Sequence, residues 1–198
     1  MRLIGLTGGI ASGKTMITDY LAELGAPVVD ADKITHLLQA PGSPVLREIA
    51  EAFGEDCLDR DGNLDRPKLA ALIFGQEEKR RRLNQIMHPR ISEAIQAEIR
   101  RYADAGEAVA IFSAPLLLEG GRSGMTDEIW VVALDPAEQV RRLMDRDGIS
   151  GEEAQKRLDA QSSLRDKLAY ADKVIDNNGS RDEARRQARA LWEEACGV

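Results

Sequence analysis

Cysteine and aromatic side chains are scarce in this chain of 198 residues, and the chain carries no excess of positive charge. Its two cysteines, Cys57 and Cys196, lie far apart and offer neither the spacing of a metal site nor a disulfide framework. We therefore expect reduced cysteines and a cytoplasmic protein. The net charge of −7 argues against bulk nucleic-acid binding, which needs a basic surface.

Long apolar runs are missing as well. No stretch approaches the ~20 residues of a membrane span. The start, Met1–Ile4, enters a predicted strand directly and lacks the pattern of a signal peptide. We expect no membrane partner, and nothing in the sequence indicates an obligate protein partner. The length allows one good-sized core with a small inserted subdomain.

The most informative motif present is Gly8–Thr15, which has the form G-x-x-x-x-G-K-[ST]. It follows the apolar run Leu3–Leu6 and precedes a helical pattern, the setting in which this motif binds phosphate. Backbone N–H groups and the positive end of the helix hold the phosphates, Lys14 reaches the β- and γ-phosphates, and Thr15 can ligate Mg²⁺. The alternative is a plain glycine-rich turn. The expected nucleotide-binding residues are Gly9, Ile10, Ala11, Ser12, Gly13, Lys14 and Thr15.

Five short apolar runs predict strands, and their continuous apolar character is typical of a parallel sheet covered on both faces. Helical patterns separate them, so the expected class is an α/β P-loop fold, with a five-stranded parallel sheet flanked by helices. The runs are Leu3–Leu6, Val28–Val29, Ala108–Phe112, Ile129–Leu134 and Val174–Ile175.

Two helical excursions interrupt the strand pattern. The helical pattern of residues 31–105 predicts an insertion that could bind the molecule accepting a phosphate. The pattern of residues 136–169 predicts a helical lid. The insertion includes a predicted helix from Pro89 to Ala105, with the proline in its first turn. We expect one domain spanning 1–198, with a core of 1–30, 106–135 and 170–198.

Asp30 and Asp32 close the second predicted strand, near the crevice at the carboxyl end of the sheet. One of them could orient or deprotonate an attacking hydroxyl in phosphoryl transfer. Either could instead cap the following helix. The third strand ends at Ser113, where P-loop enzymes often carry an aspartate, so the metal lacks an obvious carboxylate there. Glu119 or the aspartate pair could substitute.

The predicted lid carries several cations that could stabilise a transferring phosphate. Arginines that only form ion pairs with Asp145, Asp147 or Glu153 on a helix surface would give the same sequence pattern as phosphate-binding arginines. We therefore expect only one or two of these cations to be functional. The set is Arg141, Arg142, Arg146, Arg157, Arg165 and Lys167. A basic run at 79–82 is better interpreted as a solvated helix face.

The last predicted strand leads into Asn177-Asn178-Gly179. An asparagine there could hold the base of a nucleotide, or the three residues could form an ordinary turn. The GTP-specific sequence N-K-x-D does not occur, which favours ATP as the donor.

Taken in order, these elements resemble the dephospho-CoA kinase family from Leu3 to about Gly179. The loop alone occurs in many unrelated proteins, whereas the ordered set is specific. The matching elements are Leu6–Thr15, Val29–Asp32, His36, His88–Ile91, Pro115–Glu119, Arg142–Gly148, Gln161 and Ala171–Gly179.

The resemblance implies transfer of the ATP γ-phosphate to the 3′-hydroxyl of the dephospho-CoA ribose. In that family the second aspartate of Asp-x-Asp is the proposed base, and it corresponds to Asp32 here. The resemblance therefore favours a catalytic role for Asp32 over a capping role. Lys14 would neutralise the phosphates, and Thr15 would ligate Mg²⁺.

The resemblance also assigns the remaining site residues. Arg142 and Arg146 would close on ATP, Asn177 would lie near the adenine, and the insertion with His88 would hold the acceptor. Two departures from the family pattern stand out. Ala11 replaces a frequent glycine and would be mildly strained at a positive φ, and Ser113 replaces an acidic residue of some members.

Two other functions are compatible with the loop. One is a P-loop kinase acting on a nucleoside monophosphate or small alcohol. The other is a nucleotide-dependent switch that hydrolyses ATP slowly to control a partner. The ordered motifs argue against the first, and the acceptor-sized insertion argues against the second.

Overall fold

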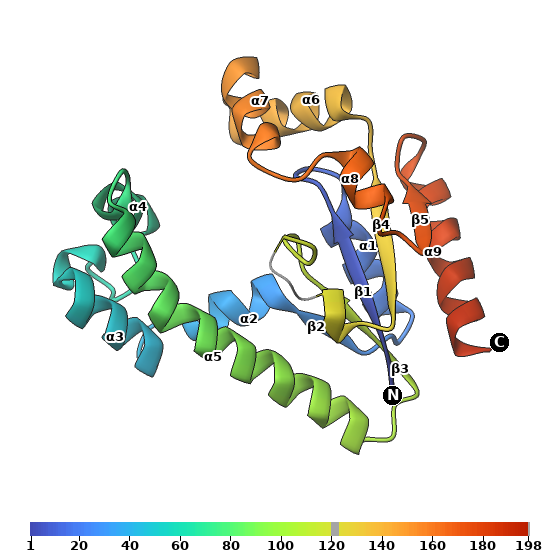
Figure 1. The fold of residues 1–198 in the computed structure, drawn as a ribbon, viewed down its shortest axis with the longest axis horizontal. Helices are drawn as coiled ribbons and strands as arrows, with labels where there is room; N and C mark the ends of the chain where they lie inside the picture. Colours follow the sequence, from blue (N-terminus) through green and yellow to red (C-terminus); the bar gives the residue numbers. More distant parts are fainter. Residues whose placement is uncertain (120–122, 198) are drawn as a thin grey trace. The chain divides into compact units, whose positions relative to one another are not determined.

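A computed structural model describes residues 1–119 and 123–197 of the chain (Figure 1). The chain divides into two compact units: residues 1–29 with 101–198, and residues 30–100.

The first unit is built on a five-stranded sheet in the order β2-β3-β1-β4-β5, which confirms the predicted parallel α/β fold. β1 lies in the middle, and its residue Leu6 is paired with Ser113 on β3 and with Trp130 on β4. The strands are β1 (Arg2–Gly8), β2 (Val28–Asp30), β3 (Val109–Ser113), β4 (Glu128–Ala133) and β5 (Lys173–Asp176). Except for Arg2, every residue of β1, β3 and β4 is buried, as continuous apolar runs predict.

Two helices, α1 (Lys14–Glu23) and α9 (Arg181–Cys196), pack together against this sheet (Figure 1). Their contact residues form one core with the inner side chains of β1, β4 and β5. The core members include Ile4, Leu6, Ile17, Leu21, Trp130, Val132, Ile175, Ala184 and Ala188. This packing holds the start of α1 at the end of β1.

Between β4 and β5 lie three short helices, where the sequence predicted a helical excursion: α6 (Pro136–Asp147), α7 (Gly151–Asp159) and α8 (Leu164–Leu168). Each begins at a capping side chain, which accepts a hydrogen bond from the exposed backbone N–H groups of the first turn. The caps are Asp135, Ser150 and Ser163. A 3₁₀ turn, η2 (Ser123–Met125), precedes β4.

The second unit is helical, with α2 (Ala31–Leu38), α3 (Pro44–Phe53), the 3₁₀ turn η1 (Glu55–Cys57), α4 (Arg66–Ile73) and most of α5 (Glu77–Asp104). It has its own apolar core, to which α3, α4 and α5 contribute. The core includes Val45, Ile49, Cys57, Leu69, Ile86 and Met87.

The prediction that a helix starts at Pro89 is wrong. α5 runs through this proline, which lies in the middle of a helix of 28 residues. A proline inside a helix removes one backbone hydrogen bond and costs roughly 3 kcal/mol. Side chains on both sides of it, Met87 and Ile91, pack into the same core, and this burial keeps the helix continuous.

No helix among the described residues combines the length and the apolar character needed to cross a membrane.

Candidate functional site

The phosphate-binding loop, Gly8–Thr15, joins β1 to α1, as the motif predicts. Its glycines leave room for side chains that come from elsewhere in the first unit. A Cβ added to Gly9 would lie 2.4 Å from Nε2 of Gln139, and one added to Gly13 would lie 2.3 Å from Nδ2 of Asn177. Gly13 also has a φ of 92°, which disfavours any residue with a side chain. A side chain at either position would therefore displace the amide of Gln139 or Asn177, even before any ligand binds.

Ala11 adopts the left-handed conformation, with a φ of 58°. It is the only described non-glycine residue with positive φ in residues 1–119 and 123–197. The positive φ is the condition under which mild strain was predicted for this position, because a Cβ in this region approaches its own backbone too closely.

Lys14 starts α1 and is almost fully buried, with 8% of its surface exposed. Its Nζ donates a hydrogen bond of 2.8 Å to the hydroxyl of Ser113 at the end of β3. That hydroxyl also lies 3.1 Å from Oγ1 of Thr18. Ser113 thus contacts the loop lysine from a position where P-loop enzymes often carry an aspartate for the metal. Thr15, the next residue of α1, is exposed.

Three side-chain amides hold the loop from outside, and we call Gln139, Gln161 and Asn177 the amide brace. Gln139 donates from Nε2 to the carbonyl of Ile10 at 2.6 Å, and Gln161 accepts the N–H of Ile10 at 2.9 Å. Asn177 donates from Nδ2 to the carbonyl of Ser12 at 2.7 Å. The amide brace therefore fixes the loop through its backbone.

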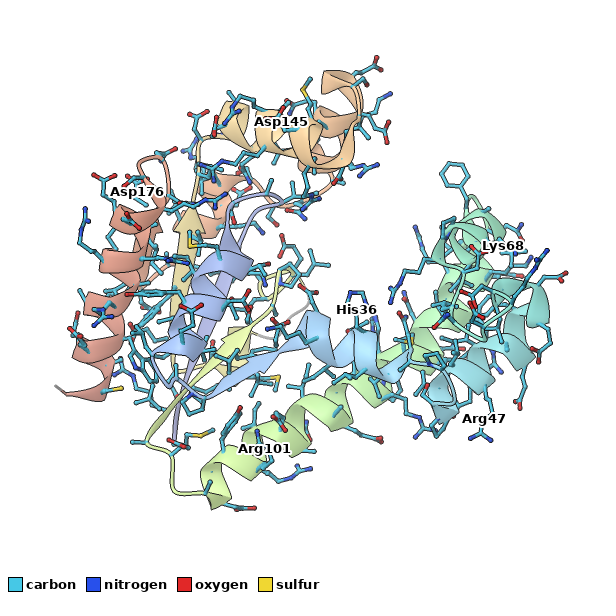
Figure 2. All side chains as sticks on the ribbon, turned by 180° about the vertical axis from the view of Figure 1, so that it is seen from behind. His36, Arg47, Lys68, Arg101, Asp145 and Asp176 are labelled. Carbon is cyan, nitrogen blue, oxygen red and sulfur yellow. The ribbon has the colours of Figure 1, made fainter. Side chains whose placement is uncertain are left out.

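Asn177 is 2% exposed, and its backbone N–H donates to the carbonyl of Ala133, so both its main chain and its side chain are fixed. The predicted role of Asn177 near the adenine stays a prediction. The asparagine that follows it, Asn178, forms a local turn with Asp176 at the end of β5 (Figure 2).

Arg142 lies on α6 between two partners. Its Nε donates to Glu138 at 2.9 Å, and its Nη2 lies 3.4 Å from the carbonyl of Asn177. Hydrogen bonds from Arg141 and Arg142 lower the pKa of Glu138 to about 2. Arg142 is thereby directed toward the chain segment that also fixes Ser12.

Three other arginines of the predicted lid, Arg141, Arg146 and Arg157, form the surface ion pairs that the sequence left open as an alternative. Arg146 pairs with Asp147 at 2.7 Å, and its hydrogen bond lowers the pKa of that aspartate. Arg157 also pairs with Asp147, at 2.9 Å. Arg141 bridges Glu138 and Asp145, the latter labelled in Figure 2.

A pocket of about 460 Å³ lies beside the loop, within the first unit. Gly9, Gln139, Gln161 and Lys167 contribute to its wall. Lys167 is 1% exposed and donates to the carboxylate of Glu119. Burial alone would raise the pKa of Glu119. The hydrogen bonds to its carboxylate, above all the one from Lys167, have the larger effect, so the pKa is lowered. Glu119, considered for the metal, is paired with this lysine.

In the second unit, the two aspartates at the end of β2 differ in environment. Asp30 is the cap of α2, with Oδ1 accepting the N–H of Asp32 at 2.9 Å and of Lys33 at 3.1 Å. Asp32 follows in the first turn and is exposed. The capping alternative therefore applies to Asp30, and Asp32 is an exposed residue of the first turn of α2.

Both histidines of the chain belong to the second unit and are exposed. His88 lies on α5, and His36 lies on α2 (Figure 2). Nδ1 of His36 is 2.6 Å from Nη2 of Arg66. Arg66 was missed by the sequence reasoning, since it precedes a proline at the start of α4 and resembles an ordinary helix start.

The comparisons with known proteins agree on one family. The family model described as dephospho-CoA kinase matches residues 2–183. The dephospho-CoA kinase of Symbiobacterium thermophilum is 45% identical over 197 residues, which cover 100% of this chain and 82% of that protein. The dephospho-CoA kinase of Corynebacterium diphtheriae is 45% identical over 193 residues, covering 98% and 96%.

Solved structures give the same result. TT1252 from Thermus thermophilus superposes with a TM-score of 0.82 at 32% identity, covering 98% of this chain and 97% of that one. Dephospho-CoA kinase from Campylobacter jejuni superposes with a TM-score of 0.68 at 25% identity, with the same coverage. A shikimate kinase from Acinetobacter baumannii, 16% identical with a TM-score of 0.53, shares the fold. The chain belongs to the dephospho-CoA kinase family, the ATP-dependent kinases of the final step of coenzyme A biosynthesis.

Proposed function

We propose that this chain phosphorylates dephospho-CoA with three groups of residues. They are the phosphate-binding loop, a base in the helical unit, and one or two arginines of the segment 136–169. The γ-phosphate of ATP passes to the 3′-hydroxyl of the ribose. The oxygen–phosphorus bond to the acceptor forms as the bond to ADP breaks, and the hydroxyl proton leaves to a base. The products are coenzyme A and ADP.

The loop supplies the donor side of this reaction. Backbone N–H groups of residues 9–15 bind the phosphate oxygens, except those of Ile10 and Ser12, which donate to Gln161 and Gly9; the positive end of α1 adds to the attraction. Lys14 neutralises charge on the β- and γ-phosphates. Its burial supports this role, because an ammonium in a water-poor site interacts more strongly with a phosphate than an exposed one does.

Thr15 is the proposed protein ligand of Mg²⁺. Mg²⁺ in nucleotide sites takes one or two protein oxygens and completes its shell with phosphates and waters. An exposed hydroxyl at the start of α1 fits that ligand set. When bound, the ion supplies positive charge that stabilises the transferring phosphate.

Asp32 is the proposed base for the acceptor hydroxyl. Two features support it: the cap of α2 is Asp30, and Asp32 is an exposed residue in the first turn of that helix. An ionised carboxylate that holds the hydroxyl can accept its proton as the new bond forms.

Arg142 is the proposed phosphate-contacting arginine of the segment 136–169, with Arg146 as the second. Arg142 is one-third exposed and held by Glu138, so it can reach a ligand without losing that partner. Arg146 would have to leave Asp147 first. Asn177 is assigned to the adenine side and His88, in the insertion, to the acceptor.

On this proposal the chain works as one kinase domain in the cytoplasm. Its partners are the small molecules ATP and dephospho-CoA, without nucleic acid, membrane or obligate protein partner. Residues 31–105 bind the acceptor and residues 136–169 form a lid.

The observation that carries the proposal is the buried Lys14 in an intact phosphate-binding loop of a chain that matches the family over residues 2–183. The test offers Mg·ATP with separate acceptors: dephospho-CoA, AMP, adenosine and shikimate. We expect ADP release and a gain of one phosphate in mass for dephospho-CoA. Phosphorylation of another acceptor instead, or ADP release that ignores every acceptor, contradicts the proposal.

A further inference from the structure

Three carbonyl groups of the phosphate-binding loop, those of Gly9, Ile10 and Ser12, accept hydrogen bonds from N–H groups of the protein. A loop of this kind attracts anions only while its N–H groups face the ligand, since a carbonyl oxygen in that place repels a phosphate. The carbonyl of Ile10 accepts from Gln139, and that of Ser12 accepts from Asn177. The carbonyl of Gly9 accepts the N–H of Ser12 at 3.1 Å, which closes a turn inside the loop. The bonds from Gln139 and Asn177 occupy two carbonyl oxygens that would repel a phosphate, and so favour the anion-binding shape of the backbone.

Ile10 is held on both of its polar groups by the segment 136–169. Gln139 lies in the first turn of α6 and is 3% exposed, so its amide has little freedom to turn away. Gln161 lies between α7 and α8. The two glutamines are 129 and 151 residues away from Ile10 along the chain, and they reach it from the two ends of the segment.

We propose that Gln139 and Gln161 are positioning residues for phosphoryl transfer, which hold Ile10 in the anion-binding shape and link the loop to the segment 136–169. This inference rests on the proposed function for its reaction, but ATP binding tests it independently. The two glutamines act with opposite polarity: Gln139 must donate a hydrogen bond, and Gln161 must accept one.

The first test removes each bond while keeping the size of the side chain. Gln139→Met and Gln161→Met in the full chain should each raise the Kd for Mg·ATP about 3- to 10-fold, the loss expected for one hydrogen bond in a partly buried site. Titration calorimetry measures the Kd, and steady-state assays give kcat and the KM for each substrate. The KM for ATP should rise more than the KM for dephospho-CoA.

The second test uses the polarity of the two bonds. A carboxylate at position 161 can still accept the N–H of Ile10, whereas one at position 139 faces a carbonyl oxygen without a proton to donate. Gln139→Glu should therefore weaken ATP binding at least several-fold more than Gln161→Glu. Lowering the pH from about 8 to about 6 should reduce that difference, because the carboxyl group at 139 regains a donor when protonated.

Gln155→Met is the matched control. Gln155 lies on α7 and lines the pocket beside Gly9, but the hydrogen bond that its amide donates, 2.7 Å long, goes to Asp159 on the same helix and not to the loop backbone. Its variant should bind ATP like the wild type.

Three results would each overturn the inference. The first is that the methionine variants melt at a lower temperature but keep the wild-type Kd for ATP. The others are an equal effect of glutamate at positions 139 and 161 on that Kd, or an equal loss of ATP affinity in Gln155→Met. Failure of the wild type to phosphorylate dephospho-CoA contradicts the proposed function instead, and leaves the ATP-binding comparison valid.

Discussion

Lys14 and Ser113 form a hydrogen bond of 2.8 Å between the first residue of α1 and the last residue of β3. Both residues are buried, so a neutral hydroxyl inside the unit is one partner of the lysine ammonium before any phosphate arrives. An aspartate at position 113 would hold the ammonium more tightly, because charge-assisted hydrogen bonds are about twice as strong as neutral ones. A serine leaves Lys14 easier to transfer to a ligand.

Ser113→Ala should destabilise the nucleotide-free protein by about 1–3 kcal/mol, because it removes a hydrogen-bond partner from a buried charged group. Bound ATP supplies phosphate oxygens to the same ammonium, so saturating ATP should restore most of that loss. Chemical denaturation with and without Mg·ATP measures both values. An equal loss in the two conditions would mean that Lys14 stays on Ser113 when nucleotide binds.

Asp32→Asn should lower kcat by about 10²-fold or more, the scale of a lost general base, while the Kd for ATP stays unchanged. Asp30→Asn is the matched control, since asparagine caps a helix about as well as aspartate does. Asp30→Ala should cost about 1 kcal/mol of stability through loss of the cap. Near-normal turnover in Asp32→Asn would remove Asp32 from the chemistry.

The fold could be predicted because each decisive feature was local in the sequence. Buried parallel strands are continuous apolar runs, and the loop is a contiguous motif between a strand and a helix. The end of the third strand was predicted at Ser113, which is the last residue of β3. The hydrogen bond from Lys14 to Ser113 could not be predicted, because it joins residues that are distant in the sequence.

The amide brace could not be derived from residue patterns. Gln139 belongs to a polar helix and Gln161 to a short connection, and neither has a spacing that signals contact with Ile10. Only the folded chain brings these residues together. The prediction of a helix start at Pro89 was wrong for a related reason. Local propensity favours a helix start at a proline, but the packing of residues on both sides of Pro89 keeps α5 continuous.

Glu138→Gln should change the acid sensitivity of the protein. The pKa of Glu138 is lowered in the folded state from 4.5 to about 2, so its pairing with Arg141 and Arg142 stabilises the fold above pH 4.5. That contribution is lost as the pH falls from 4.5 toward about 2. In the variant, stability should fall less steeply across this window. At pH 7 the change should be small, since solvent screens exposed pairs. Denaturation midpoints at several pH values test this, and identical slopes for both proteins would contradict it.

Ala11→Gly should raise stability by about 0.5 kcal/mol. A left-handed alanine costs roughly 1–2 kcal/mol, and glycine avoids that cost while adding roughly 0.5–1 kcal/mol of backbone entropy to the unfolded chain. Ala22→Gly is the matched control, an exposed position inside α1 where glycine should cost about 1 kcal/mol. Opposite signs for the two variants in chemical denaturation support the strain at Ala11. Destabilisation by both would show that the loop fits alanine without strain.

Glu119 and Lys167 should behave as a coupled pair. Lys167 is 1% exposed, so Glu119→Gln leaves a buried ammonium without its counter-charge and should cost about 3 kcal/mol. Lys167→Met should cost less, because the side chain of Glu119 is 22% exposed and can be hydrated. In the double variant no buried charge is left unpaired, so its loss should be smaller than the sum of the single losses by at least about 1 kcal/mol. Urea denaturation of the four proteins closes this cycle. Strict additivity would mean that the two side chains contribute independently, and that the wall of the pocket beside Gly9 is held by packing alone.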